Sequence, residues 1–134
     1  MIILSWNSNR IRQKAGEFLE FVKDWKPDVI TLQKTRLKPV DSFNIPNYIT
    51  YRTDRISYAG GGTAILVRNR IPHHSIHIET TLIENTIITI ERRNSPPITT
   101  VSAYKSPSKD LSHMENFSGK RQIVSSYEIA IVNT

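Results

Sequence analysis

Apolar and polar positions near the N-terminus follow the order strand, helix, strand. Residues 2–6 form a short apolar run that is typical of a strand. From Ile11 onward, apolar residues recur with the spacing of one helix face, and Pro27 ends this pattern. A second strand is predicted over residues 29–33. Two strands joined in this way predict a βαβ unit with parallel strands and a right-handed crossover. The apolar helix face comprises Ile11, Ala15, Phe18, Leu19, Val22 and Trp25.

The rest of the chain alternates between strand-like runs and turn residues, which predicts mainly antiparallel strands. Together with the βαβ unit, this density of strands indicates an α/β fold, a layered α/β sandwich. Residues 105–120 are polar, and one helical turn is expected within them over residues 111–117. The expected strands cover residues 48–52, 63–67, 75–80, 82–91, 98–104 and 123–132, and the expected turns cover 60–62, 68–72 and 94–97.

The βαβ unit predicts where a functional site would form. The carboxyl ends of two parallel strands lie at one edge of the sheet, which is where ligand sites of open α/β sheets form. Asn7 and Lys34 leave the two strands at equivalent positions, so we expect them to be neighbours. The stretch from Pro27 to Leu37 therefore delivers a polar cluster, residues 33–36, to this edge.

The charge balance favours a polyanionic partner. Lys and Arg outnumber Asp and Glu by 18 to 12, which gives a formal net charge of +6 over 134 residues. Such a domain favours DNA as a partner, because neutralising phosphates releases counterions. The alternative is that the basic residues serve solubility alone, since they are spread along the chain rather than gathered in a tail.

The composition also excludes several classes of site. Cysteine is absent, which excludes disulfides, thiolate metal sites and a cysteine nucleophile. The N-terminal apolar run is too short for a signal peptide, and no run reaches the length of a membrane span. The glycines at 60–62 lack the Lys-Ser/Thr pair of a phosphate-cradling loop. We therefore expect an intracellular protein, nuclear or cytoplasmic and not secreted, with no membrane partner and no small-molecule cofactor.

Histidines near the middle of the chain raise the question of a zinc site. His73, His74 and His77 lie close together in sequence, but neighbouring strand positions face opposite ways. No cysteine or suitably spaced carboxylate completes a tetrahedral ligand set. We therefore expect these histidines to be solvated strand residues.

Five short motifs follow one another over the first 110 residues. They are ILSWNSNRI (3–11), KPDVITLQKT (26–35), YRTDR (51–55), GGGTAILVR (60–68) and SAYKSP (102–107). Together they resemble the endonuclease/exonuclease/phosphatase superfamily, and most closely the endonuclease domain of jockey-type non-LTR retrotransposons from arthropods. Each motif is short, but five motifs in the order found in this family are specific to it.

The resemblance implies a two-sheet α/β sandwich of the DNase I-like type that cuts phosphodiester bonds with Mg²⁺. In a retrotransposon, the resulting nick in target DNA primes synthesis by a reverse transcriptase region on the same polypeptide. The family's metal-binding and phosphate-binding Asn falls on Asn7, and its active-site Tyr falls on Tyr104. The family's principal metal carboxylate, a Glu, falls on Lys34.

The sequence departs from the family pattern in ways that bear on catalysis. The ammonium of Lys34 has no lone pair and would repel a metal ion, and Arg10 replaces a family Gly. The later Gly-Asp-x-Asn and Ser-Asp-His motifs have no counterpart, since residues 111–113 lack the Asp. We therefore expect residues 1–110 to be the N-terminal half of such a domain and residues 111–134 a divergent tail. We also expect no intact metal site, no bound Mg²⁺ and no catalysis by this chain alone.

Two interpretations of Lys34 stay open. Its ammonium could replace the charge of the metal and bind the DNA backbone without cutting it. Alternatively, Lys34 reflects drift in a decaying element copy, and on the sequence alone we favour drift. Basic residues that could contact phosphates are Arg10, Lys34, Arg36, Arg55 and Arg68, with scattered solvated charge as the alternative.

Three functional hypotheses follow from the sequence. The first is a truncated, inactive retrotransposon-type endonuclease domain. The second is a metal-independent nucleic-acid-binding module that uses the basic surface around Lys34. The third is a non-functional fragment of a decayed mobile element with marginal stability.

Overall fold

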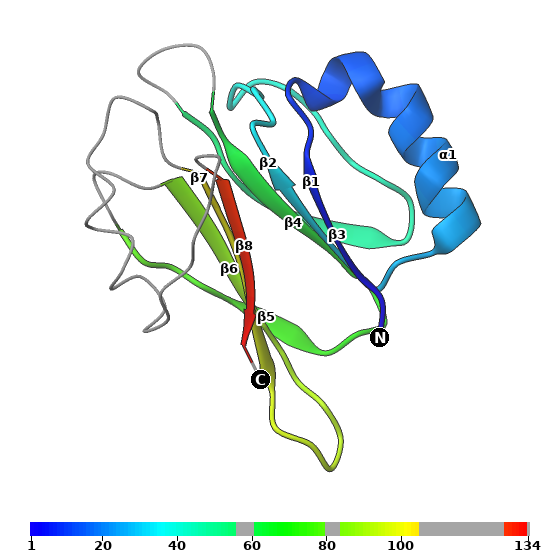
Figure 1. The fold of residues 1–134 in the computed structure, drawn as a ribbon, viewed down its shortest axis with the longest axis vertical. Coiled ribbons are helices and arrows are strands. Elements are labelled where there is room, and N and C mark those ends of the chain that lie inside the picture. The colour runs from blue at the N-terminus through cyan, green and yellow to red at the C-terminus, as the bar shows by residue number, and fades with distance from the viewer. Residues whose placement is uncertain (56–60, 80–83, 105–127, 134) are drawn as a thin grey trace.

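The computed structural model describes residues 1–55, 61–79, 84–104 and the strand at 128–133. Two four-stranded sheets pack face to face, and one α-helix covers the outer face of the first sheet (Figure 1). The strand orders are β1-β2-β4-β3 and β5-β6-β7-β8. This arrangement confirms the predicted α/β sandwich.

The first sheet begins with the predicted βαβ unit. Strands β1 (Ile3–Asn7) and β2 (Val29–Gln33) are parallel, and Asn7 lies opposite Gln33. They are joined by a 3₁₀ turn, η1 (Ile11–Lys14), and by α1 (Ala15–Trp25). Strand β4 (Thr63–Arg68) pairs antiparallel with β2 on one side and with β3 (Tyr48–Thr53) on the other.

The second sheet is antiparallel throughout. It contains β5 (His73–Ile76), β6 (Glu84–Ile90), β7 (Ile98–Tyr104) and β8 (Glu128–Asn133). The strand expected over 75–80 is shifted toward the N-terminus, because β5 begins at His73, directly after the predicted turn, and ends at Ile76. The last strand is β8, and the helical turn expected over 111–117 lies outside the described residues.

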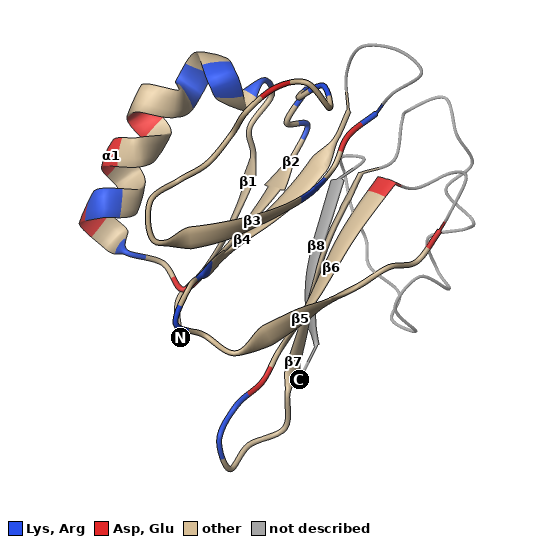
Figure 2. Ribbon diagram, turned by 180° about the vertical axis from the view of Figure 1, so that it is seen from behind, with Lys and Arg blue, Asp and Glu red and all other residues tan. Residues whose placement is uncertain are grey.

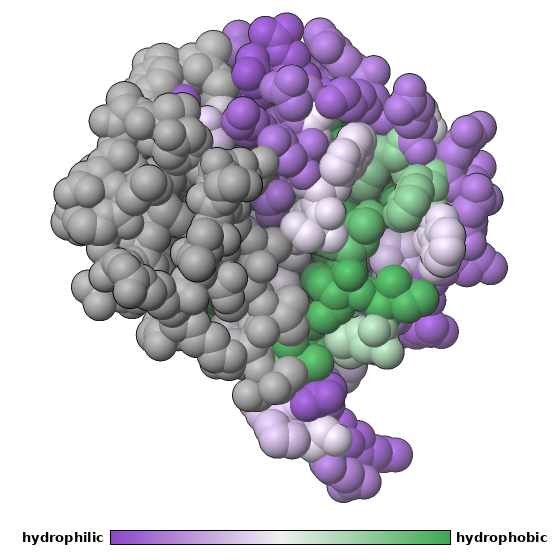
Figure 3. Space-filling model, in the orientation of Figure 1, coloured by the Kyte–Doolittle hydropathy of each residue, from purple (hydrophilic) through white to green (hydrophobic). Residues whose placement is uncertain are grey.

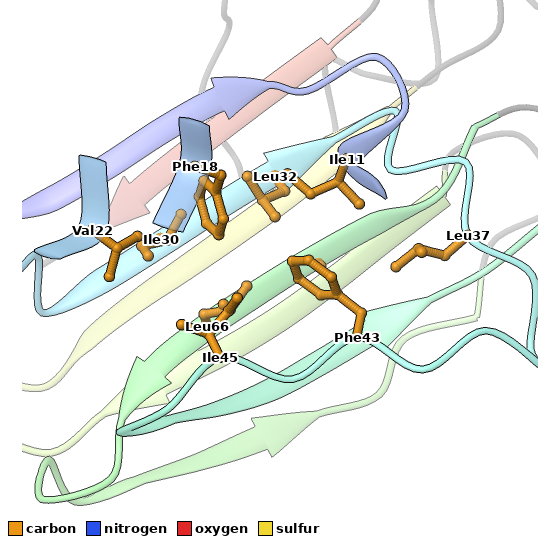
Figure 4. Packing of buried hydrophobic residues seen from close by; sticks show 10 residues of the cluster. Ile11, Phe18, Val22, Ile30, Leu32, Leu37, Phe43, Ile45 and Leu66 are labelled. Carbon is orange, nitrogen blue, oxygen red and sulfur yellow. The ribbon is translucent and has the colours of Figure 1, made fainter. Parts of the chain in front are cut away.

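The helix packs on the first sheet through the predicted apolar face (Figure 4). Phe18 lies at its centre, with ring centroids 5.8 Å from Trp6 and 6.2 Å from Phe43. Phe43 belongs to the loop between β2 and β3, which closes over the same core. A second cluster fills the space between the sheets and includes Val29, Ile65, Val67, Ile88, Ile90 and Ile98.

One residue of the predicted apolar face does not reach the core. Trp25 is 62% exposed, although its spacing from Phe18 placed it on the buried side. Helical side chains lean toward the N-terminus, so the indole covers the preceding turn and stacks on Phe21. The two ring centroids lie 6.1 Å apart. Met1 and Ile2 are also exposed, and Figure 3 shows an apolar area on the face where β1 lies.

Candidate functional site

The loops that follow β1 and β2 are joined by backbone hydrogen bonds. Ser8 donates its N–H to the Gln33 carbonyl at 2.9 Å, and its hydroxyl donates to the same oxygen at 3.0 Å. Arg10 then donates its N–H to the Lys34 carbonyl at 3.0 Å. The predicted proximity of Asn7 and Lys34 at this edge of the sheet is therefore confirmed. We call this end of the first sheet the Lys34 edge, defined by Asn7, Arg10, Lys34 and Arg36.

The backbone around Lys34 is unusual and is supported by two glycines. Lys34 and Arg36 have φ values of 52° and 54°, in the left-handed region. Thr35 donates its N–H to the Gly62 carbonyl at 3.2 Å, and Arg36 donates to the Gly61 carbonyl at 2.8 Å. A Cβ on Gly62 would lie 2.5 Å from Thr35 Oγ1. The glycines before β4 thus allow close backbone approach, in agreement with the tight turn predicted there.

Lys34 points over an aromatic ring supplied by the other sheet. Its Nζ lies 5.5 Å from the ring centroid of Tyr104, the last residue of β7. Arg55 Cζ lies 5.9 Å from the same ring, which is only 8% exposed. Because the ring face is electron-rich, it attracts both cations and orients them. Lys34 forms no ion pair with any residue in the described part of the chain.

A carboxylate that the sequence did not single out lies beside Tyr104. Glu84 begins β6 directly opposite Tyr104 in register. Its Oε1 accepts a hydrogen bond from Arg55 Nε at 2.5 Å, and its Oε2 accepts the Gly62 N–H at 2.6 Å. Both oxygens are thus engaged, and Arg55 balances the charge. Sequence spacing gives no signal for this pair, because it joins residues from different sheets.

Buried polar contacts fix the two sheets relative to each other near this edge. Gln33 Nε2 donates to Ser102 Oγ at 3.0 Å, and Ser102 Oγ donates to the Leu32 carbonyl at 2.7 Å. The hydroxyls of Thr63 and Thr86 lie 2.9 Å apart. Buried hydrogen bonds of this kind are directional, so they hold the end of β2, and Lys34 directly after it, in position over Tyr104 on β7.

Two buried oxygen atoms at the Lys34 edge lack a hydrogen-bond partner among the described residues. They are Asn7 Oδ1 and Thr35 Oγ1. Nearly all buried polar atoms in folded proteins are paired, because an unpaired one costs about 1–3 kcal/mol. An unpaired amide oxygen beside a lysine therefore suits a ligand that brings its own hydrogen-bond donor or positive charge.

The described residues do not fit a magnesium ion, which prefers carboxylate and water ligands. Lys34, where the motif resemblance implies a carboxylate, carries an ammonium instead, and both oxygens of Glu84 are already bound. Asp28 lies at the opposite end of β2, where its Oδ2 accepts the Ile2 N–H at 2.7 Å. No three His, Asp or Glu side chains gather at one place within residues 1–55, 61–79 and 84–104.

The candidate phosphate-contacting cations do not form one patch. Arg10 and Arg36 are exposed at the Lys34 edge, while Arg55 is paired with Glu84. Arg68 lies at the opposite end, where its N–H donates to the Asp28 carbonyl at 3.1 Å. Figure 2 shows basic residues at both ends of the first sheet. The structure therefore brings Arg10, Lys34 and Arg36 together and excludes Arg68 from the group.

The expectation of solvated histidines is wrong for His73. Its Nδ1 lies 2.6 Å from the Ile71 carbonyl, so this nitrogen carries the proton and donates. Its Nε2 then accepts from the Tyr51 hydroxyl at 2.8 Å. His73 thus faces Tyr51 of β3 in the first sheet, whereas His74 and His77 are exposed.

Asp54 follows β3 near this edge and is only partly satisfied. Its Oδ2 accepts from Arg52 Nε at 3.1 Å, but its Oδ1 is buried without a partner in the described structure. Burial raises the pKa of Asp54 above its usual value of 3.8, and the Arg52 guanidinium opposes this shift only in part. The ionised form therefore carries a desolvation cost in the folded state.

Replacing Asp54 with Asn is expected to change how stability depends on pH. Near neutral pH the ionised carboxyl destabilises the folded state, and this penalty disappears as the pH falls through the raised pKa. The stability of the native chain relative to Asp54→Asn should therefore increase on acidification. Urea unfolding of both proteins at neutral pH and at about pH 3.5, below the usual pKa of the group, measures the difference. If the free energies of unfolding of the two proteins differed by the same amount at both pH values, the raised pKa of Asp54 would be contradicted.

Comparison with known proteins agrees with this fold. The model of the endonuclease/exonuclease/phosphatase family matches residues 4–126. The chain belongs to this family. It is therefore a nuclease- or phosphatase-type domain, in agreement with the resemblance of its motifs. A search among curated proteins found no match. No helix in the described part of this family member has the length and apolar composition to cross a membrane.

Proposed function

We propose that this chain is a retrotransposon-type endonuclease domain of the jockey kind that binds nucleic-acid phosphates at the Lys34 edge without cutting them. The observation that carries the proposal is the placement of the Lys34 ammonium, at the position where the motif resemblance implies a carboxylate. It lies 5.5 Å from the Tyr104 ring centroid and forms no ion pair within the described residues. An oriented, unpaired cation beside exposed arginines suits a phosphate.

The chemistry of such binding is sequence-independent. An ammonium donates up to three hydrogen bonds to phosphate oxygens, and Arg10 and Arg36 add charge on the same edge. Asn7 Oδ1 lacks a donor in the described structure, so it can accept a hydrogen bond from an ordered water that bridges to the phosphate. None of these groups reads base edges, so affinity is expected to follow charge rather than sequence.

The biological setting belongs to the same proposal. It rests on the five motifs, which suit a mobile element that nicks target DNA, with a reverse transcriptase region on the same polypeptide. In that setting the protein is intracellular, nuclear or cytoplasmic, and its ancestor used Mg²⁺. A decayed copy with no function is the simplest competing account, and it provides no reason for Lys34 to be held over Tyr104.

A second candidate function is hydrolysis by the chain itself. The buried, unpaired Asn7 Oδ1 favours it, since an amide oxygen can ligate a cation. Against it stands the engagement of both Glu84 oxygens by Arg55 and Gly62. The two functions differ in whether the phosphodiester bond breaks.

A plasmid-nicking assay with Mg²⁺ distinguishes them. We expect no nicking above background by the native chain. We expect none by Lys34→Glu either, because one carboxylate does not replace a ligand set. Circular dichroism spectra of both proteins would show that each is folded. Nicking by the native chain that EDTA abolishes would overturn the proposal in favour of hydrolysis.

A further inference from the structure

A cavity of about 510 Å³ opens at the end of the first sheet opposite Lys34. It lies between the last turns of α1, the segment before β3 and the end of β4. The Lys34 edge contributes no residue to it. A volume of this size is typical of small-ligand sites, which span about 300–1,000 Å³.

The floor of the cavity is apolar. Leu19 and Val22 come from α1, and Ile45 comes from the loop before β3. The ring of Tyr48, the first residue of β3, completes the floor. The Tyr48 hydroxyl donates to the Pro27 carbonyl at 2.5 Å, which fixes the ring at the floor. A flat apolar group can therefore pack here without leaving a buried hydroxyl unpaired.

The rim of the cavity is cationic. Lys23, Lys26, Arg68 and Arg70 line it, and no acidic residue does. None of the four forms an ion pair within the described ranges. Arg68 Nε donates to the Pro27 carbonyl at 3.2 Å, which orients its guanidinium beforehand. These four cations come from α1, from β4 and from the segments that follow them, and together they create a field that favours a polyanionic group.

Two amides and Pro46 complete the lining. Asn47 and Asn69 both face the cavity, and the Asn69 N–H donates to the Asn47 carbonyl at 3.0 Å. An Asn side chain offers an acceptor and two donors, which match the edge of a heterocyclic base. The cavity thus brings four cations, an apolar floor and two amide groups together around one open space.

We propose that this cavity binds a mononucleotide. The phosphate would contact the four rim cations, the base would pack against Leu19, Ile45 and Tyr48, and the amides would bind the base edge. The site is separate from the Lys34 edge and does not depend on the function proposed there.

Calorimetric titration with AMP, in buffer that contains EDTA, tests the proposal. Inorganic phosphate and adenosine serve as probes of the two halves of the ligand. We expect AMP to bind at least tenfold more tightly than either. We expect Arg70→Glu and Lys23→Glu each to weaken AMP binding at least tenfold, since both side chains are exposed and their replacement should leave the fold intact. Arg93→Glu, which makes the same change in the β6–β7 turn, should bind AMP like the native chain.

Several outcomes would overturn the proposal. One is AMP binding that is no tighter than phosphate binding, and another is an equal loss of AMP affinity in Arg70→Glu and Arg93→Glu. Binding of a short single-stranded oligonucleotide or an acidic peptide without binding of AMP would assign the cavity to another ligand. Lys34→Ala should leave AMP affinity unchanged, and a loss in that variant would place the nucleotide at the Lys34 edge instead.

Discussion

The substitution Gly62→Ala is expected to lower the free energy of unfolding by about 2–4 kcal/mol. Gly62 has φ +90°, a conformation that disfavours any residue with a Cβ. The added methyl would also lie 2.5 Å from Thr35 Oγ1. The contact cannot relax easily, because the Thr35 N–H is bound to the Gly62 carbonyl. Urea unfolding of the native and variant proteins measures the loss.

The chain offers a matched control at Gly16. This residue is exposed near the start of α1, and a Cβ built on it meets nothing within 4 Å. Gly16→Ala should therefore stabilise the protein by about 0.5–1 kcal/mol, because alanine loses less backbone entropy in a helix. A Gly62→Ala variant as stable as the native chain would contradict the close approach of Gly62, before β4, to Thr35, after β2.

Charge reversal at Lys34 is expected to weaken binding of duplex DNA at least tenfold. Lys34→Glu removes a cation and sets a carboxylate beside the phosphate, so attraction becomes repulsion. The variant also loses the cation that lies over the Tyr104 ring. Fluorescence anisotropy of a labelled duplex in EDTA measures the affinity. Lys34→Ala should have an intermediate affinity, since it loses attraction without gaining repulsion.

Arg93→Glu separates a local effect from net charge. It changes the charge by the same amount in the turn between β6 and β7, far from the Lys34 edge (Figure 1). We expect its affinity for DNA to fall less than threefold, because exposed charges beyond the Debye length are screened. Equal losses in Lys34→Glu and Arg93→Glu would show that binding follows net charge alone.

The sequence predicts the fold well where one face of an element is buried. Two patterns predict the βαβ unit, namely the helix spacing of Phe18 and Val22 and the apolar run of β2. The parallel direction of its strands then predicts that Asn7 and Lys34 lie close together. These features are local or follow from strand direction. Trp25 shows the limit, because spacing alone does not tell whether the end of a helix lies over the sheet.

The site is less predictable, because its contacts join residues from both sheets. The pairing of Arg55 with Glu84 and the position of Lys34 over Tyr104 depend on how the sheets pack, which no single segment encodes. Arg68 was grouped with the other cations on charge alone. Its strand runs antiparallel to β2, and this places it at the far end.

The most direct test of the central claim is a salt titration of DNA binding in excess EDTA. For the native chain, the logarithm of the association constant should fall linearly with the logarithm of the salt concentration between about 50 and 200 mM. For Lys34→Ala, the slope should be shallower by about one unit, since one phosphate contact is gone. These results would establish metal-independent phosphate binding at the Lys34 edge. An affinity that does not change with salt, or an identical slope and affinity in Lys34→Ala, would contradict it.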